Sequence, residues 1–206
     1  MRRVLATTLT VLWSLLTGLV HAQFSAAQLV ADARSQIGVT TRYDASYQTL
    51  GYPNGDVAIS GGVCTDVVIR GLRHQGIDLQ QLLHEDMRRN FAEYPKLWQL
   101  KRADKNIDHR RVPNLQRYFL RQGWALKLPD SAQARAVDAF VPGDLVTWIL
   151  PGNLPHIGII SDQKARLTGQ YLVLHNVGQG AQEEDSLASW PLTGHFRVPS
   201  DRAKQL

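Results

Sequence analysis

The chain has 206 residues, of which 44% are hydrophobic, so it is long enough to bury the core of one ordinary domain. Its formal net charge is +5 at pH 7. Because the basic residues are spread along the chain and form no stripe, the composition argues against a nucleic-acid-binding protein. A mild positive charge suits a protein that lies near acidic wall or membrane polymers.

The first segment has the pattern of a secretory signal. A basic pair at positions 2 and 3 precedes an apolar run over 4–20, and Ala22 closes a small-residue cleavage site. We therefore predict a signal peptide over 1–22 and a periplasmic or secreted mature protein. The alternative is an uncleaved anchor, because the apolar run is close to membrane-spanning length, whereas no later segment approaches that length.

Residues 23–206 are predicted to form a single domain that begins with helices. Ser25 can cap a helix over 26–36, and the aromatic, Gly- and Asn-rich stretch that follows, 41–62, is predicted to be a loop. A second helix is expected from Cys64 to Gly76. Two further helices are expected over 79–91, capped by Asp78, and over 112–122, opened by Pro113.

The hydrophobic period then changes to that of strands. Short segments rich in β-branched and aromatic residues are separated by Pro, Gly, Asn and Asp. They predict antiparallel strands at 124–128, 144–150, 156–161, 171–177 and 195–198. Helices followed by a meander of strands indicate an α+β domain, with an antiparallel sheet against which the N-terminal helices pack.

Cys64 is the only cysteine, so it forms no disulfide within the chain. It stands at the expected start of a helix, where free N–H groups and the helix dipole lower a thiol pKa. Gly61 and Gly62 allow a tight approach of the backbone, which would offer N–H groups to an oxyanion. The alternative is a small, inert core residue.

A cysteine nucleophile needs a base and a group that orients the base. His156 begins one predicted strand, and His175 ends the next. If these strands pair, His156 can face Cys64 while His175 holds its imidazole. Because strand residues alternate between faces, only one of His175 and Asn176 can take that part. For either histidine alone, the alternative is a core residue whose hydrogen bonds are satisfied within the protein and which has no catalytic role.

The order of these motifs resembles the NlpC-type cell-wall peptidases, which are papain-like cysteine hydrolases. The matching pieces are GGVCTDVV, PGDLVTW, HIGIIS and LVLHN. The resemblance implies a papain-like core with Cys64 as nucleophile, His156 as base and His175 as third residue, with Tyr43 or Tyr47 near the site. The stretch from TRYD to GHFR is also similar to a YijF-like group of uncharacterised envelope proteins.

The chain departs from the NlpC pattern in two places. Val63-Cys64-Thr65-Asp66 stands where the family usually has Asp-Cys-Ser-Gly, and the link of roughly 74–141 is long enough to be a helical insert. We expect substrate contacts from that insert and from the flanks of the two motifs. The candidates are Tyr43, Tyr47, Asp66, Glu85, Asp86, Arg110 and Asn176. For Asp66, capping of the helix is the alternative.

The sequence therefore predicts an exported hydrolase that cleaves an amide bond in peptidoglycan peptides and uses no metal or organic cofactor. It does not indicate the oligomeric state. An acyltransferase or esterase could use the same residues. A non-catalytic module could bind wall polymer or a partner protein through the same cleft. A zinc hydrolase built from His84, Asp86, Asp108 and His109 is possible in principle, but their spacing better fits a solvated helix face.

Overall fold

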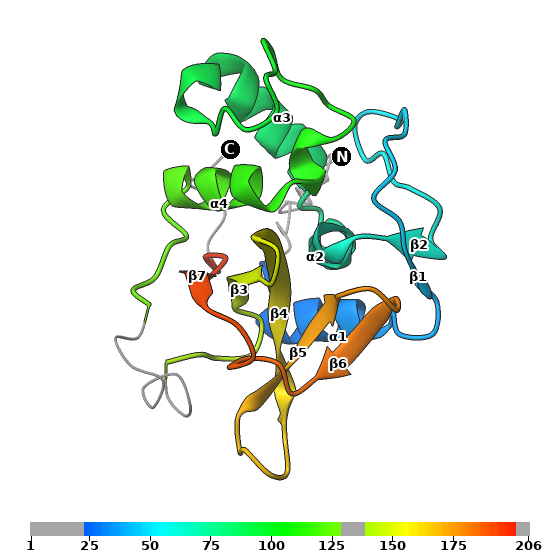
Figure 1. Ribbon diagram of the computed structural model, residues 1–206, viewed down its shortest axis with the longest axis vertical. Coiled ribbons are helices and arrows are strands. Elements are labelled where there is room, and N and C mark those ends of the chain that lie inside the picture. The colour runs from blue at the N-terminus through cyan, green and yellow to red at the C-terminus, as the bar shows by residue number, and fades with distance from the viewer. Residues whose placement is uncertain (1–22, 129–138, 201–206) are drawn as a thin grey trace, which may run out of the picture.

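A computed structural model describes residues 23–128 and 139–200 of the chain (Figure 1). The predicted signal peptide, residues 1–22, lies outside the described residues, as do ten residues of the predicted insert, 129–138. Within the two described ranges, no helix has the length and apolar character needed to cross a bilayer.

All four expected helices are present. They are α1 (Ala26–Arg34), α2 (Cys64–Arg73), α3 (Leu79–Arg89) and α4 (Val112–Arg121), with two short 3-10 turns, η1 (Phe91–Glu93) and η2 (Asp108–Arg110). The predicted caps act as expected, because Ser25 accepts from Gln28 N–H and Asp78 accepts from Gln80 N–H. α1 and α3 end two residues earlier than predicted.

The main sheet has five antiparallel strands. These are β3 (Leu145–Leu150), β4 (Leu154–Lys164), β5 (Tyr171–Asn176), β6 (Ala181–Glu184) and β7 (Leu192–Phe196), in the order β6-β5-β4-β3-β7. The α+β expectation is confirmed. The sheet is not a simple meander, because β7 returns to pair with the free edge of β3.

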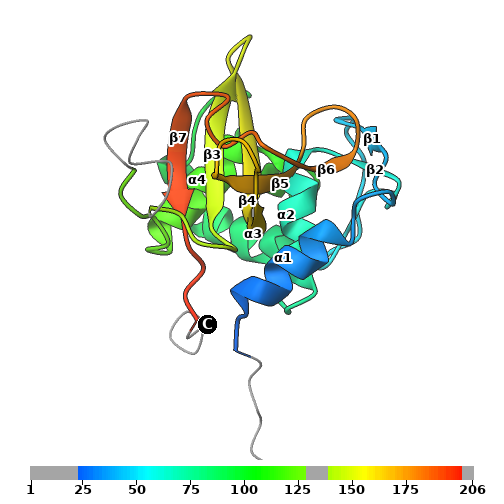
Figure 2. The same cartoon turned by 90° about the horizontal axis from the view of Figure 1, so that it is seen from below.

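Three details of the strand prediction were wrong. Residues 124–128 make only an isolated bridge, from Ala125 to Phe196, and β6 lies in a segment for which no strand was predicted. Within the predicted loop, β1 (Arg42–Tyr43) and β2 (Gly61–Gly62) form a short parallel pair. This pair joins the edge of the sheet, because Ala181 N–H donates to Thr40 O at 2.8 Å (Figure 2).

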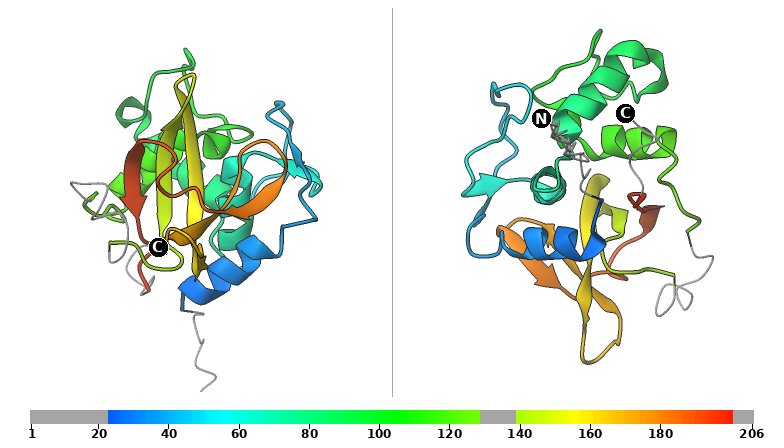
Figure 3. Two further views of the ribbon diagram at one scale, coloured as in Figure 1. Left: turned by 60° about the horizontal axis from the view of Figure 1, so that its bottom comes forward. Right: turned by 180° about the vertical axis from the view of Figure 1, so that it is seen from behind.

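Different parts of the chain pack on the two faces of the main sheet. α1 and α2 pack on one face, against Ile157, Ile159 and Leu174, and the right panel of Figure 3 shows α1 lying across β4 and β5. The opposite face carries a second cluster that includes Val146, Trp148, Ile160, Val173 and Leu187. Because alternate residues of a strand face opposite ways, these clusters fix the face of the β4 side chains up to Ile160, where the register shifts, and of the β5 side chains from Val173 onward.

Candidate active site

The start of α2 is built by a carboxylate and a glycine. Asp66 Oδ2 accepts a hydrogen bond from Val63 N–H at 2.6 Å, which satisfies a donor at the helix N-terminus. Gly62 has a φ of 155°, and a Cβ there would lie 2.9 Å from Asp66 Oδ2. The glycine therefore lets the backbone pass close to Asp66, and the chain turns directly into Cys64.

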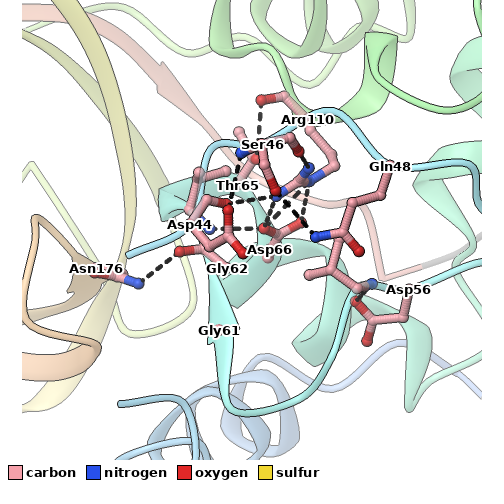
Figure 4. Close-up of polar contacts among 12 residues, drawn as sticks. Asp44, Ser46, Gln48, Asp56, Gly61, Gly62, Thr65, Asp66, Arg110 and Asn176 are labelled. Carbon is pink, nitrogen blue, oxygen red and sulfur yellow. Dashed lines mark hydrogen bonds and ion pairs between the residues drawn. The ribbon is translucent and has the colours of Figure 1, made fainter. Parts of the chain in front are cut away.

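Arg110 locks this turn in place (Figure 4). Its Nε and Nη2 donate to the two oxygens of Asp66 at 3.0 and 2.9 Å, and its remaining donors reach the carbonyls of Ser46 and Asp44 at 3.1 and 3.0 Å. The Arg110 and Asp66 side chains are only 2% and 4% exposed. We call these two side chains and their partner carbonyls the Arg110 cluster. Both side chains therefore hold the backbone at the start of α2, and their predicted contact with substrate stays a prediction.

Asn176 joins the same turn to the sheet. Its side-chain amide donates to Gly62 O at 3.0 Å and to Arg42 O at 3.3 Å, so it ties the end of β5 to the β1–β2 pair (Figure 4). Asn176 therefore fixes the backbone before Cys64 and is not placed as a substrate contact.

The Cys64 side chain is buried, with 4% of its surface exposed. Burial raises the pKa of its thiol to about 12, and the negative charge of Asp66 adds to the rise, while N–H groups of Ile157, Thr65 and Cys64 itself act in the opposite direction. The N–H groups at the helix start favour the thiolate as expected, but the prediction of a lowered pKa is wrong because removal from water outweighs them. At neutral pH the resting sulfur is a thiol.

His156 and His175 form a hydrogen-bonded pair on the sheet. The register of β4 and β5 places His175 opposite Gly158, so both histidines project from the face that α2 does not cover. His156 Nε2 lies 2.8 Å from His175 Nδ1, and His175 Nε2 lies 2.9 Å from Glu184 Oε2. The prediction that His175 holds the His156 imidazole is confirmed in geometry. We call these three residues the histidine chain.

Aromatic side chains surround the pair and shield His156 from solvent. Trp148 and Trp190 each lie 5.9 Å from the His156 ring, measured between ring centroids, and His156 is only 3% exposed. Burial lowers the pKa of His156 to about 3 and lowers that of His175 as well, although the Glu184 carboxylate opposes the second shift. Both imidazoles are therefore neutral at neutral pH.

The Cys64 sulfur and the histidine pair lie near the same end of the β4–β5 pair. The N–H of Ile160 donates to Asp144 O on the β3 side, so by alternation the N–H of Ile157 points toward β5. The register pairs of β4 with β5 begin at Ile159, and the Ile157 N–H lies close enough to Cys64 to favour its thiolate. The sulfur thus lies at the strand edge, next to the residue that follows His156.

The structure does not show a direct Cys64–His156 contact. His156 Nδ1 has no hydrogen-bond partner within residues 23–128 and 139–200, and the two side chains approach the strand edge from opposite faces of the sheet. The pairing of Cys64 with His156 stays a prediction.

A cavity of about 370 Å³ opens beside Cys64. Its wall includes Tyr43, Tyr47, Trp98, Arg110, Arg111 and Pro155. Burial raises the pKa of Tyr43 to about 12, and the nearby Cys64 and Asp66 add to the rise. Both predicted tyrosines therefore lie at the cavity, and Pro155 brings it to the residue before His156.

The predicted contacts from α3 lie elsewhere. Asp86 is held by Arg121 Nε at 2.7 Å and by Tyr94, and Glu85 accepts from Gln81 at 2.9 Å. Neither lines the cavity beside Cys64. In the described part of the chain, no group of three or more His, Cys, Asp and Glu residues is arranged to hold a metal ion, so the four residues of the zinc alternative are not gathered into a site.

Sequence reasoning missed Glu184. The sequence predicted a turn at GQG and no strand at AQEED, although AQEE forms β6 and pairs with β5. The signal was weak, since only one residue of the strand is apolar and edge strands often carry charge.

The comparisons with known proteins agree on the family. The family model described as "Domain of unknown function (DUF1287)" matches residues 30–198. The chain is 52% identical over 182 residues to "Uncharacterized protein YijF" of Escherichia coli (strain K12), which covers 86% of this chain and 84% of that protein.

The chain was also compared with solved structures. The structure of NlpC1 from Trichomonas vaginalis matches with a TM-score of 0.44 and 13% sequence identity, over 87% of this chain and 48% of that chain. The chain therefore spans about half the length of that protein.

Proposed function

The chain belongs to the DUF1287 family, and we propose that it is an exported cysteine hydrolase that cleaves an amide bond in the peptides of peptidoglycan. One observation carries the proposal. The 2.8 Å hydrogen bond between His156 and His175 holds an oriented imidazole near the strand edge at which the Cys64 sulfur lies. The order of motifs that resembles NlpC-type peptidases supports the same assignment of roles.

The mechanism starts from a neutral thiol and a neutral imidazole. Because the two side chains approach the strand edge from opposite faces, the reaction requires a local rearrangement that brings the Cys64 S–H to His156 Nδ1. That nitrogen takes the proton as the sulfur attacks the amide carbonyl. N–H groups at the start of α2 stabilise the oxyanion. The imidazolium keeps its Nε2–H bond to His175 and then protonates the leaving amine, and water hydrolyses the thioester.

The expected location and the cavity support the substrate class. The signal-like first segment and the +5 charge suit a protein among acidic envelope polymers. In the cavity, Arg111 stacks on Trp98 with its guanidinium carbon 4.1 Å from the ring centroid, and a planar guanidinium is well suited to the carboxylates of wall peptides.

The pH dependence of Cys64 alkylation by iodoacetamide tests the proposal. In the wild-type protein we expect a rate component that rises as His156 loses its proton and stays flat above that pH. In His156→Ala only the rise of a buried thiol toward high pH should remain. Since Cys64 is the only cysteine, all labelling reports on this site. Identical profiles in the two proteins would refute the proposal.

The raised thiol pKa favours a second candidate, a non-catalytic module that binds wall polymer through the same cavity. This candidate expects slow alkylation in both proteins and full binding to purified peptidoglycan sacculi in Cys64→Ala. The hydrolase expects Cys64→Ala to bind the sacculi but release no new amino groups from them.

A further inference from the structure

We propose that Glu184 is a positioning residue, which fixes the tautomers of both histidines so that His156 presents its free lone pair at Nδ1. The inference rests on the proposed function, because that lone pair is the base for Cys64. It concerns a residue at the edge of the sheet, two strands away from His156.

Strand pairing brings Glu184 to the correct face. Glu184 is the register partner of Val173, which lies on the same face of β5 as His175. Its Oε2 lies 2.9 Å from His175 Nε2, and Ser186 Oγ lies 3.4 Å from the same nitrogen. The neighbouring Glu183 faces the other way and binds Arg34 at 2.8 Å.

An ionised carboxylate can only accept hydrogen bonds, so Nε2 of His175 must carry the hydrogen. A neutral His175 then has its lone pair at Nδ1. That lone pair accepts the Nε2–H of His156, which leaves the lone pair of His156 at Nδ1. The carboxylate thus sets the direction of every hydrogen bond in the histidine chain.

Without the carboxylate, the chain can run in the opposite direction. His175 would carry its hydrogen on Nδ1 and donate it to His156 Nε2, and His156 would then hold its hydrogen on Nδ1. In that tautomer His156 cannot accept the proton of Cys64. The indoles of Trp148 and Trp190 supply no acceptor, and the Ser186 hydroxyl can both donate and accept. Glu184 is therefore the group that decides between the two directions.

Two measurements on the full chain test the inference. The ring ¹⁵N shifts of His156 and His175 report which nitrogen carries the hydrogen, and we expect the Nε2–H form of both in the wild type. In Glu184→Gln a share of both rings should change to the Nδ1–H form. The His156-dependent part of Cys64 alkylation should fall by about tenfold or more. Glu184→Asp should keep the wild-type tautomers.

Glu183→Gln is the matched control, because it removes the same charge one residue away and breaks the contact with Arg34. It should leave both tautomers and the alkylation profile unchanged. Unchanged tautomers in Glu184→Gln, or an equal effect of Glu183→Gln, would overturn the inference. If His156→Ala leaves alkylation unchanged, the proposed hydrolase fails, while the ¹⁵N shifts still decide whether Glu184 orients the pair.

Discussion

Two polar networks lie on opposite faces of the sheet, and they differ in how completely the hydrogen bonds of their buried groups are satisfied. In the Arg110 cluster, both oxygens of Asp66 accept hydrogen bonds, and Nε, Nη1 and Nη2 of Arg110 all donate to protein oxygens. Such a network holds one geometry.

The histidine chain is satisfied at one end only. Glu184 closes it at the sheet edge, but His156 Nδ1 has no hydrogen-bond partner in the described ranges. The comparison teaches that burial and charge alone do not mark a reactive group. A closed network positions the backbone of Cys64, whereas a network with one open nitrogen can take up a proton.

Breaking the Arg110 cluster should have the largest effect on stability. Arg110→Met leaves the carboxylate of Asp66 buried without its cation, at a site where its side chain is 4% exposed. We expect a loss of roughly 3–5 kcal/mol in the free energy of unfolding, measured by urea denaturation. Adding Asp66→Asn should recover part of the loss, because the uncompensated charge is removed.

Arg117→Met is the control for this prediction. Arg117 pairs with Glu93 on the surface, where the side chains are 35% and 51% exposed, so the loss should stay below about 1 kcal/mol. Equal losses in the two variants would show that the Arg110 cluster is no more important for stability than a solvated ion pair.

Local sequence signals predicted most of the fold. The four helices follow from caps and apolar periodicity, and the β4–β5 pairing followed from two apolar runs that each carry a histidine at one end. The pairing of His156 with His175 could be predicted because both lie near the same end of neighbouring strands. These features depend on residues that are close in sequence or in adjacent elements.

The Arg110 cluster could not be predicted from local sequence signals. Arg110 and Asp66 are 44 residues apart, and nothing in either local sequence indicates that an arginine from η2 reaches the start of α2. The raised pKa of Cys64 was also missed, because a helix start is visible in the sequence while the depth at which it is buried is not. Tertiary burial decided both outcomes.

The pH dependence of stability tests whether the histidine chain is neutral in the folded protein. His156 has a folded pKa of about 3, far below the ordinary value of 6.5. Between these values the unfolded chain binds a proton that the folded protein does not, so stability falls as the pH falls. The His156 contribution should be roughly 1.4 kcal/mol per pH unit between about pH 6 and 4.

Comparison with His156→Gln isolates this contribution. His109 has the same low pKa, and Asp108 has a raised pKa of about 6 that acts with the opposite sign, but both groups are present in the two proteins. Urea denaturation at several pH values should therefore give a shallower acid slope for the variant. Parallel slopes would mean that His156 is protonated in the folded state, and the neutral chain would be refuted.

Gly158→Ala should disturb the histidine chain with a smaller loss of stability than Arg110→Met causes. A Cβ at this position would lie 2.5 Å from Val173 Cγ1 and 3.2 Å from His175 Cβ, so the side chains of β5 must shift. We expect a loss of roughly 1–2 kcal/mol, typical of mild overpacking. Because the shift moves His175 away from His156, the His156-dependent part of Cys64 alkylation should fall by more than this loss of stability explains.

Gly76→Ala is the control for this prediction. It lies at a turn with a φ of 74° and open space around the Cβ, so it strains the backbone at a distance from the histidine pair. If Gly76→Ala lowers alkylation as much as Gly158→Ala does, reactivity follows global stability, and the distinction between a network that holds the backbone and one that moves a proton fails.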